Sequence, residues 1–216
     1  MLALRFSVCT LLLAGSPAFA AKHAVLVAGS NGFHNYRHQA DIAHAYSILV
    51  KGGVPADNIV VMMFDDIAHA LKNKFKGQLF NRPDAPDGTA PPDVYGPVKD
   101  HIDYRKHHVS PKNFLKVLTG DSSAPGSELT SGPDDDVFVY FADHGGRGIL
   151  GFPNLINFPP IPGKVLHADE LNTALQTMKS KNMFKRLVFY VEACAPWPMP
   201  ASPPSCRTHL VAPAQA

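Results

Sequence analysis

Four short runs of consecutive apolar residues constrain the fold of this chain more than any other feature. Each run holds five or six residues, at positions 24–28, 59–64, 137–141 and 187–191. Runs of this length are typical of strands that are buried on both faces, as in a parallel sheet covered by helices. The chain has 216 residues, which is enough for one domain with its own core.

Segments with helical spacing lie between these runs. Residues 37–51 carry apolar side chains at roughly helical intervals and are followed by Gly52. Ser110 precedes a proline, a typical helix start, and this second helix is expected to end at Gly120. A third apolar stripe occupies residues 168–181. The alternation of strands and helices predicts an α/β domain with a mostly parallel central sheet flanked by helices.

Prolines are concentrated in segments that interrupt this alternation. Residues 74–109 and 151–163 combine proline with glycine and polar residues. This composition predicts long surface loops with little regular structure.

The first 20 residues have the layout of a secretory signal peptide. Arg5 precedes an apolar stretch at residues 6–15, and Ala18 and Ala20 form a small-residue cleavage pattern. The apolar stretch is too short for a stable membrane anchor, although an uncleaved anchor is the alternative at this point. We therefore expect residues 1–20 to be removed, and no membrane association of the mature chain.

Composition and charge exclude several classes of protein. The net charge is +2, from 20 basic and 18 acidic residues, so nothing predicts a nucleic-acid partner. Three cysteines, at positions 9, 194 and 206, are too few for a disulfide framework. His107 and His108 are more typical of a solvated loop than of a zinc site, which needs several convergent ligands. We expect no metal and no cofactor.

Chemically active residues follow the carboxyl ends of three predicted strands, in segments 30–38, 143–146 and 192–194. In open parallel sheets, this edge is where ligands bind. His144 and Cys194 match a base and a nucleophile, because a thiolate attacks a carbonyl while an imidazole moves the proton. The residues alone are also compatible with a structural buried thiol and a surface histidine.

Several segments, in the same order, resemble one family. They are residues 27–32 (VAGSNG), 35–41 (NYRHQAD), 59–66 (IVVMMFDD), 140–153 (YFADHGGRGILGFP) and 189–194 (FYVEAC). On these segments the chain resembles the legumain family of cysteine peptidases, which are asparaginyl endopeptidases or vacuolar processing enzymes. The resemblance runs from about residue 22 to Cys194. It implies a caspase-like fold over residues 21–194 and hydrolysis of peptide bonds after asparagine.

The resemblance also implies the catalytic residues. Cys194 matches the nucleophile, and His144 matches the proton carrier. Asn35 matches the asparagine that orients this histidine. Gly145 would contribute its backbone N–H to the oxyanion hole, where hydrogen-bond donors stabilise the developing negative charge.

Four further residues match the substrate pocket and its surroundings. Arg37, His38 and Glu192 match residues that line the pocket for asparagine. A pocket with both charges suits a carboxamide, which donates and accepts hydrogen bonds. As alternatives, Arg37 and His38 are compatible with a solvated helix start, and Glu192 with a loop carboxylate. Asp143 matches an aspartate that the family links to succinimide formation and ligase activity.

The resemblance implies partners and a location as well. The expected partners are protein or peptide substrates with asparagine at the cleavage site, and cystatin-type inhibitors. The expected location is the secretory pathway, leading to the lysosome or vacuole or to the exterior.

Past Cys194 the sequence departs from the family. Residues 195–216 are rich in proline, so we expect a non-family tail that supplies no central strand. The sheet would then lack its last strands and expose one edge. Two alternatives to an active peptidase stay open: a catalytically incompetent homologue that acts at most as a binding or decoy module, and a GPI-anchor transamidase-like subunit. The strings at residues 143–145 and 192–194 favour legumain over the latter.

Overall fold

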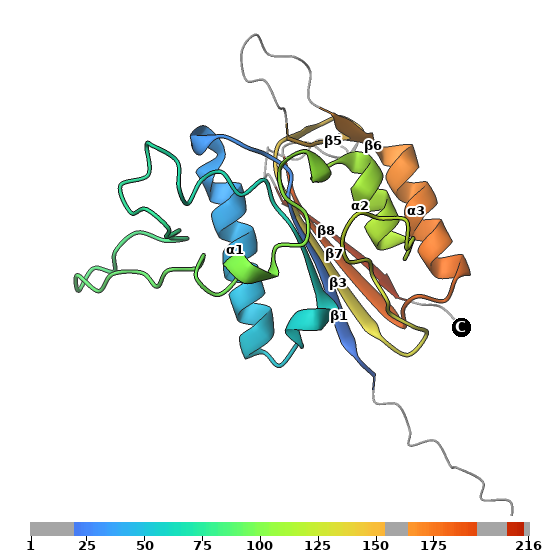
Figure 1. The fold of residues 1–216 in the computed structure, drawn as a ribbon. Coiled ribbons are helices and arrows are strands. Elements are labelled where there is room, and N and C mark those ends of the chain that lie inside the picture. Colours follow the sequence, from blue (N-terminus) through green and yellow to red (C-terminus); the bar gives the residue numbers. More distant parts are fainter. Residues whose placement is uncertain (1–19, 154–163, 194–206, 214–216) are drawn as a thin grey trace, which may run out of the picture.

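A five-stranded sheet forms the centre of the molecule in the computed structural model (Figure 1). The structure describes residues 20–153 and 164–193, and the backbone of residues 207–213. The strand order is β2-β1-β3-β7-β8, and the first four strands are parallel. Their bounds are Lys22–Ala28 for β1, Ile59–Met62 for β2, Asp136–Ala142 for β3, Arg186–Glu192 for β7 and Arg207–Pro213 for β8. All four predicted runs are strands of this sheet, so the predicted mostly parallel α/β fold is confirmed.

Three α-helices cover the two faces of the sheet. Helix α1 lies on one face, and α2 and α3 pack together on the other (Figure 1). Their bounds are Tyr36–Lys51, Pro111–Leu118 and Ala168–Ser180. The Ser110 hydroxyl accepts a hydrogen bond from the Asn113 backbone N–H at 3.3 Å, which confirms the predicted N-cap. The three predicted helices are therefore present within a residue or so of their expected bounds.

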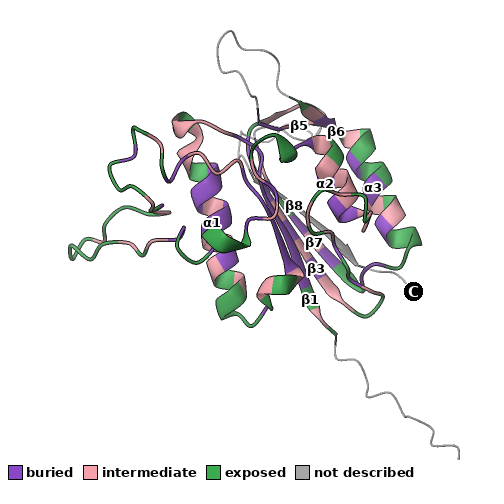
Figure 2. Cartoon of the chain, in the orientation of Figure 1, coloured by how far each residue is buried: buried purple, intermediate pink, exposed green. Residues whose placement is uncertain are grey.

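The apolar core is divided into two clusters by the sheet. In β1, Val25 and Val27 belong to the cluster under α2 and α3, whereas Leu26 belongs to the cluster under α1. This alternation follows from the two-residue period of a strand. Both faces of β1 are therefore buried, as Figure 2 shows in purple, which explains why its sequence is apolar without interruption.

The segment from residue 74 to 109 contains little regular structure, as predicted, but some of its side chains are packed into the core. Its described 3-10 turns are η3, Lys99–His101, and η4, Lys106–His108. Leu79, Val98 and Ile102 are 5% exposed or less and pack in the cluster under α1. The segment is thus an extension of the core on that face. Two further 3-10 turns, η1 (Phe33–Asn35) and η2 (Ala56–Asn58), flank α1.

A small second sheet was not predicted from the sequence. It consists of β4 (Gly145–Gly146), β5 (Ile149–Gly151) and β6 (Val165–His167), paired antiparallel. Strands of two or three residues are too short to show a hydrophobic period. This sheet starts one residue after His144 and so fixes the loop that follows β3.

The expectation of an exposed sheet edge is wrong. Residues 207–213 form β8, which pairs antiparallel with β7, from Arg207 opposite Glu192 to Pro213 opposite Arg186. The tail therefore covers the edge of β7, and it does so as an edge strand rather than a central one. Its single proline is the last residue of the strand, where a missing N–H is tolerated.

Some expected features lie outside the described residues. These are residues 1–19 of the expected signal peptide, residues 154–163 of the expected loop at 151–163, the proposed nucleophile Cys194, and residues 195–206 and 214–216 of the tail. Among the helices that the structure describes, none combines the length and the apolar character needed to cross a membrane.

Candidate active site

Three strands end at the same level and bring the predicted segments together. Ala142 of β3 lies opposite Ala28 of β1 and Glu192 of β7. Two hydrogen bonds continue the pairing past the strand ends, from Gly29 N–H to the Ala142 carbonyl at 3.1 Å and from Asp143 N–H to the Glu192 carbonyl at 3.0 Å. The residues after β1, β3 and β7 thus share one edge of the sheet, as the parallel arrangement predicted.

His144 is held by the side chain of Asn35. The Asn35 amide donates through Nδ2 to the Asn31 carbonyl at 2.9 Å, so its Oδ1 faces His144 Nε2 at 2.8 Å. An amide oxygen only accepts hydrogen bonds, so this contact assigns the proton of the neutral ring to Nε2. The other ring nitrogen, Nδ1, is then the basic atom. Asn35 ends η1 and His144 follows β3, so two distant parts of the chain meet here.

A second, buried group of polar side chains lies beside this pair. His38 is 1% exposed and Asp143 is 5% exposed. His38 Nδ1 lies 2.7 Å from the Ser30 hydroxyl and 3.4 Å from Asp143 Oδ1. We call Ser30, His38 and Asp143 the floor of the site. The ring centroids of His38 and His144 are 5.1 Å apart, edge to face, so the floor contacts His144.

Burial shifts the acid–base properties of the floor. Desolvation, followed by the charge of Arg37 and the proximity of His144, lowers the pKa of His38 to about 3. Desolvation raises the pKa of Asp143 to about 7, against smaller lowering effects from the His144 backbone hydrogen bond, Arg37 and Ser30. At mildly acid pH both side chains are therefore uncharged. Desolvation, and then Arg37, also lowers the pKa of His144, which favours its neutral, basic form.

Two glycines leave the space that Asp143 occupies. A Cβ atom on Gly29 would lie 2.8 Å from both Asp143 Cβ and the Gly151 carbonyl oxygen. A Cβ atom on Gly151 would lie 2.8 Å from Asp143 Oδ2. These distances are too short for any other residue, so the close approach of the backbone defines the position of this carboxyl group.

The predicted pocket residues occupy different surroundings. Arg37 is exposed near the start of α1, whereas His38 faces the floor. Glu192 is half-buried at the end of β7, and its Oε2 accepts a hydrogen bond from the Tyr140 hydroxyl at 2.7 Å. Gly145 begins β4 directly after His144. Their roles in substrate binding and in the oxyanion hole stay predictions.

The proposed nucleophile follows this arrangement in sequence. Cys194 lies outside the described residues, two positions after Glu192 and directly after the buried Ala193. The strand that leads to it, β7, is paired with β3, which leads to His144. That Cys194 joins His144 at this edge stays a prediction.

One group of side chains in the described part of the chain has the composition of a metal site. Ligand atoms of His38, Asp143 and His144 lie within 4.8 Å of one another. However, His38 Nδ1 is in contact with Ser30, and His144 Nε2 with Asn35. These contacts use one ring nitrogen of each histidine, so the arrangement suits proton transfer better than metal binding.

Sequence analysis assigned no role to several residues that the structure places at the site. Ser30 contacts His38, and Tyr140 contacts Glu192. Asp66 contacts the loop that carries Asn35. Asp66 had a signal in the sequence, because Asp65 and Asp66 directly follow the apolar run at residues 59–64, at the same edge of the sheet.

A histidine oriented by an amide at the carboxyl edge of a parallel sheet is suited to proton transfer. Comparison with known sequences gives the family. Residues 22–216 match the model of the Peptidase C13 family, and the chain belongs to this family. The matched region continues beyond Cys194 into the tail.

The curated relatives include proteins from animals and plants. The chain is 47% identical over 184 residues to legumain of Homo sapiens, covering 82% of this chain and 39% of that protein. It is 47% identical over 173 residues to hemoglobinase of Schistosoma japonicum, covering 80% and 37%. It is 45% identical over 175 residues to vacuolar-processing enzyme beta-isozyme 1 of Oryza sativa subsp. japonica, covering 79% and 32%. The chain thus spans less than two fifths of the length of these relatives.

Proposed function

We propose that this chain is a cysteine endopeptidase that cleaves peptide bonds after asparagine. Cys194 attacks the scissile carbonyl as a thiolate, and His144 first takes up the thiol proton and then delivers it to the leaving amine. The backbone N–H of Gly145, with that of Cys194, stabilises the oxyanion. Water then hydrolyses the acyl-enzyme and restores the thiol.

One observation carries this proposal: the 2.8 Å contact between His144 Nε2 and Asn35 Oδ1. It fixes the ring plane and leaves Nδ1 as the base. Membership of the Peptidase C13 family and the identity to legumain support the same chemistry. A surface histidine without function would not need an amide that is itself fixed by a backbone carbonyl.

The specificity for asparagine rests on Arg37 and Glu192. The guanidinium is a donor for the carboxamide oxygen, and the carboxylate is an acceptor for its NH₂ group. The Tyr140 hydroxyl bond holds the carboxylate of Glu192 in one orientation. A substrate aspartate would carry a negative charge in place of the NH₂ donor and would be repelled by that carboxylate, except where low pH neutralises it.

The proposed working environment is mildly acidic. Asp143 has a pKa of about 7, so below neutral pH it is uncharged and places no buried negative charge beside His38. This agrees with a route through a cleaved signal peptide at residues 1–20 to a lysosome, a vacuole or the exterior. Asparagine-containing proteins would be the substrates, and cystatin-type proteins the inhibitors.

The second candidate function is that of a binding or decoy module without turnover. The observation that favours it is the sequence directly after Cys194, where Pro196, Pro198 and Pro200 restrict the backbone beside the proposed nucleophile. Such a module would bind asparagine-containing peptides through Arg37 and Glu192 without hydrolysing them.

One experiment separates the two candidates. The full chain is incubated at mildly acid pH with fluorogenic peptides that differ only in asparagine, aspartate or glutamine at the cleavage site. Selective turnover of the asparagine peptide, lost in Cys194→Ala, supports the peptidase. A chain that unfolds cooperatively and binds the peptide without turnover supports the module. Equal cleavage of all three peptides would contradict the proposed specificity.

A further inference from the structure

Two consecutive aspartates follow β2 and have no role in the function described so far. Asp65 and Asp66 end the segment at residues 59–66 and lie at the same edge of the sheet as His144. Asp65 has a positive φ of 61°, which is uncommon for a residue other than glycine. This conformation turns the chain so that the two carboxylates contact different parts of the molecule.

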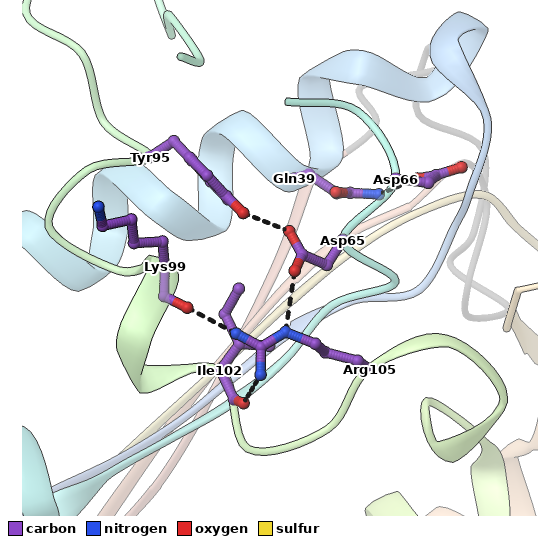
Figure 3. Close-up of polar contacts among 7 residues, drawn as sticks. All are labelled: Gln39, Asp65, Asp66, Tyr95, Lys99, Ile102 and Arg105. Atoms are coloured by element: carbon purple, nitrogen blue, oxygen red, sulfur yellow. Dashed lines mark hydrogen bonds and ion pairs between the residues drawn. The ribbon is translucent and has the colours of Figure 1, made fainter. Parts of the chain in front are cut away.

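Asp65 faces the long segment that returns from β2 to α2. Its Oδ1 accepts a hydrogen bond from the Tyr95 hydroxyl at 2.9 Å, and its Oδ2 accepts one from Arg105 Nε at 2.8 Å (Figure 3). Arg105 in turn donates to the backbone carbonyls of Ile102 and Lys99, at 2.8 and 2.5 Å. None of these partners contacts Asn35, His38 or His144 in the described hydrogen bonds. Asp65 therefore anchors the long segment only.

Asp66 faces the site loop instead. Its Oδ2 accepts a hydrogen bond from the Gly32 backbone N–H at 2.8 Å. Its Oδ1 accepts one from Gln39 Nε2, also at 2.8 Å, as Figure 3 shows. Gly32 lies just before η1, and Gln39 lies in the first turns of α1. One carboxylate thus holds both ends of the stretch between them.

The stretch between these two contacts contains three of the predicted site residues. Asn35, Arg37 and His38 all lie between Gly32 and Gln39. Gly32 has a φ of 83°, so the chain enters this stretch through a conformation that side chains other than glycine rarely adopt. The hydrogen bond from the Gly32 N–H to Asp66 therefore helps to fix the path of the chain into this stretch.

We propose that Asp66 is a positioning residue that orients His144 through the loop that carries Asn35. It touches neither the substrate nor His144. With both oxygens engaged, it fixes Gly32 and Gln39 relative to the end of β2, and the Asn35 amide then lies 2.8 Å from His144 Nε2. For catalysis, this inference rests on the proposed peptidase function; for the state of His144, it stands on the contacts alone.

The chemistry of the carboxylate makes a sharp test possible. Asp66 accepts from two N–H donors, and an asparagine has only one acceptor oxygen. Asp66→Asn therefore keeps the shape of the side chain but turns an NH₂ group toward one of the donors. Asp65→Asn is the matched control, because it makes the same chemical change one residue away and weakens only the contacts of the long segment.

The test is carried out on the full chain with two readouts. The first is the ¹⁵N spectrum of the His144 ring, in which the protonated and the unprotonated nitrogen have distinct shifts. Asp66→Asn is expected to move His144 from one tautomer, with the proton on Nε2, toward a mixture, while Asp65→Asn leaves the wild-type tautomer. A wild-type His144 spectrum in folded Asp66→Asn would overturn the proposal.

The second readout is turnover. Asp66→Asn is expected to lower kcat about tenfold to a hundredfold, because small displacements of a catalytic group have effects of this size, and Asp65→Asn to change it less than about twofold. In combination with Asn35→Ala, the Asp66→Asn substitution should lower kcat little further, since both act on one contact. Fully additive losses would overturn the proposal. If the wild type shows no turnover, the proposed function fails while the ¹⁵N readout still decides this inference.

A milder variant covers the case in which Asp66→Asn does not fold. Gln39→Met removes the Oδ1 contact of Asp66 and leaves the Gly32 contact in place. The Gln39 side chain is buried, 1% exposed, and is similar in size to that of methionine. It should shift His144 partly toward the tautomer mixture, and an unchanged His144 ring in this folded variant would count against the proposal.

Discussion

His38 and His144 have ring centroids 5.1 Å apart, yet their surroundings differ in almost every respect. His38 is 1% exposed and lies with Ser30 and Asp143 in the floor, whereas His144 is exposed and contacts Asn35. We call Asn35, Arg37 and His144 the rim of the site. In the floor, desolvation decides which protonation states exist. In the rim, desolvation is again the largest cause of the lowered pKa of His144, but this ring is exposed, and the charge of Arg37 lowers its pKa further.

The comparison shows how one site separates stability from chemistry. A base must gain and lose a proton in each cycle, which a ring with a pKa of about 3 does not do near neutral pH. The floor therefore provides shape, and in the proposed peptidase His144 of the rim would transfer the proton. Substitutions in the floor should change the free energy of unfolding, and those in the rim should change activity or the state of His144.

The largest effect on stability is expected from Gly29→Ala. The new Cβ atom would lie 2.8 Å from Asp143 Cβ and from the Gly151 carbonyl oxygen. Neither of these atoms is at the far end of a flexible side chain, so neither can move away easily. Overpacking of this kind costs about 1–3 kcal/mol, and the rigid neighbours place this site near 3 kcal/mol. Urea unfolding measures the loss.

Gly132→Ala provides the control for this substitution. Its new Cβ atom would have only Asp135 Oδ2 in its neighbourhood, at 3.7 Å. Its unfolding free energy should stay within about 0.5 kcal/mol of the wild type. Equal losses in the two variants would show that the space around Asp143 is not tightly defined.

The second prediction concerns the pH dependence of stability. Asp143 has a raised pKa, so its contribution favours the folded state at low pH and is lost as the pH rises from about 4 to about 7. His38 has a lowered pKa, so its contribution is lost as the pH falls from about 6.5 to about 3. In the wild type these opposite slopes offset each other over much of the acid range.

Single substitutions should expose the two slopes. In Asp143→Asn, stability should rise with pH between about 4 and 6, because the titration of His38 is then no longer offset by that of Asp143. In His38→Gln it should fall over the same range. Each slope is at most about 1.4 kcal/mol per pH unit, the value for one proton. Denaturant titrations at several pH values measure them, and two variants with slopes of the same sign would contradict the assignment.

A third prediction concerns the rim. Asn35→Ala should lower the unfolding free energy by about 1 kcal/mol or less, because its hydrogen bonds lie partly in solvent. If the chain is the proposed peptidase, the same variant should lower kcat about tenfold to a hundredfold, since the ring of His144 is no longer fixed. The ratio of the two effects distinguishes the rim from the floor. A loss of stability as large as that of Gly29→Ala would remove the distinction.

The sequence predicted the fold well because its strands are apolar without interruption. In residues 24–28 both faces are buried, whereas in residues 187–191 one face is less covered and Tyr190 is 40% exposed. Ser110 marks a helix start by its own chemistry. The small sheet around residues 145–167 was missed because strands of two or three residues leave no periodic signal. The edge strand at residues 207–213 was missed because the prolines before it dominated the interpretation of the tail.

The site was predictable in its membership but not in its organisation. The segments 30–38 and 143–146, together with Glu192, fall on one edge of a parallel sheet, as the strand pattern predicted, while the roles of their residues stay predictions. The division into floor and rim depends on which side chain is desolvated, and that follows from Gly29 and Gly151 allowing Asp143 to approach the backbone. Contacts between residues far apart in the chain, such as Asp66 with Gly32, have no signature in a single sequence.

The smallest effect is expected from Arg37→Gln in the rim. The positive charge of Arg37 lowers the pKa of His144 after desolvation has done so, and its removal should therefore raise that pKa. Stability should change by less than about 0.5 kcal/mol, because Arg37 is exposed. NMR titration of the His144 ring measures the shift, and added salt should reduce the difference between wild type and variant, since salt screens exposed charges. Had the floor rather than the rim controlled His144, its pKa would respond to Asp143→Asn and not to Arg37→Gln, and that outcome would reverse the comparison.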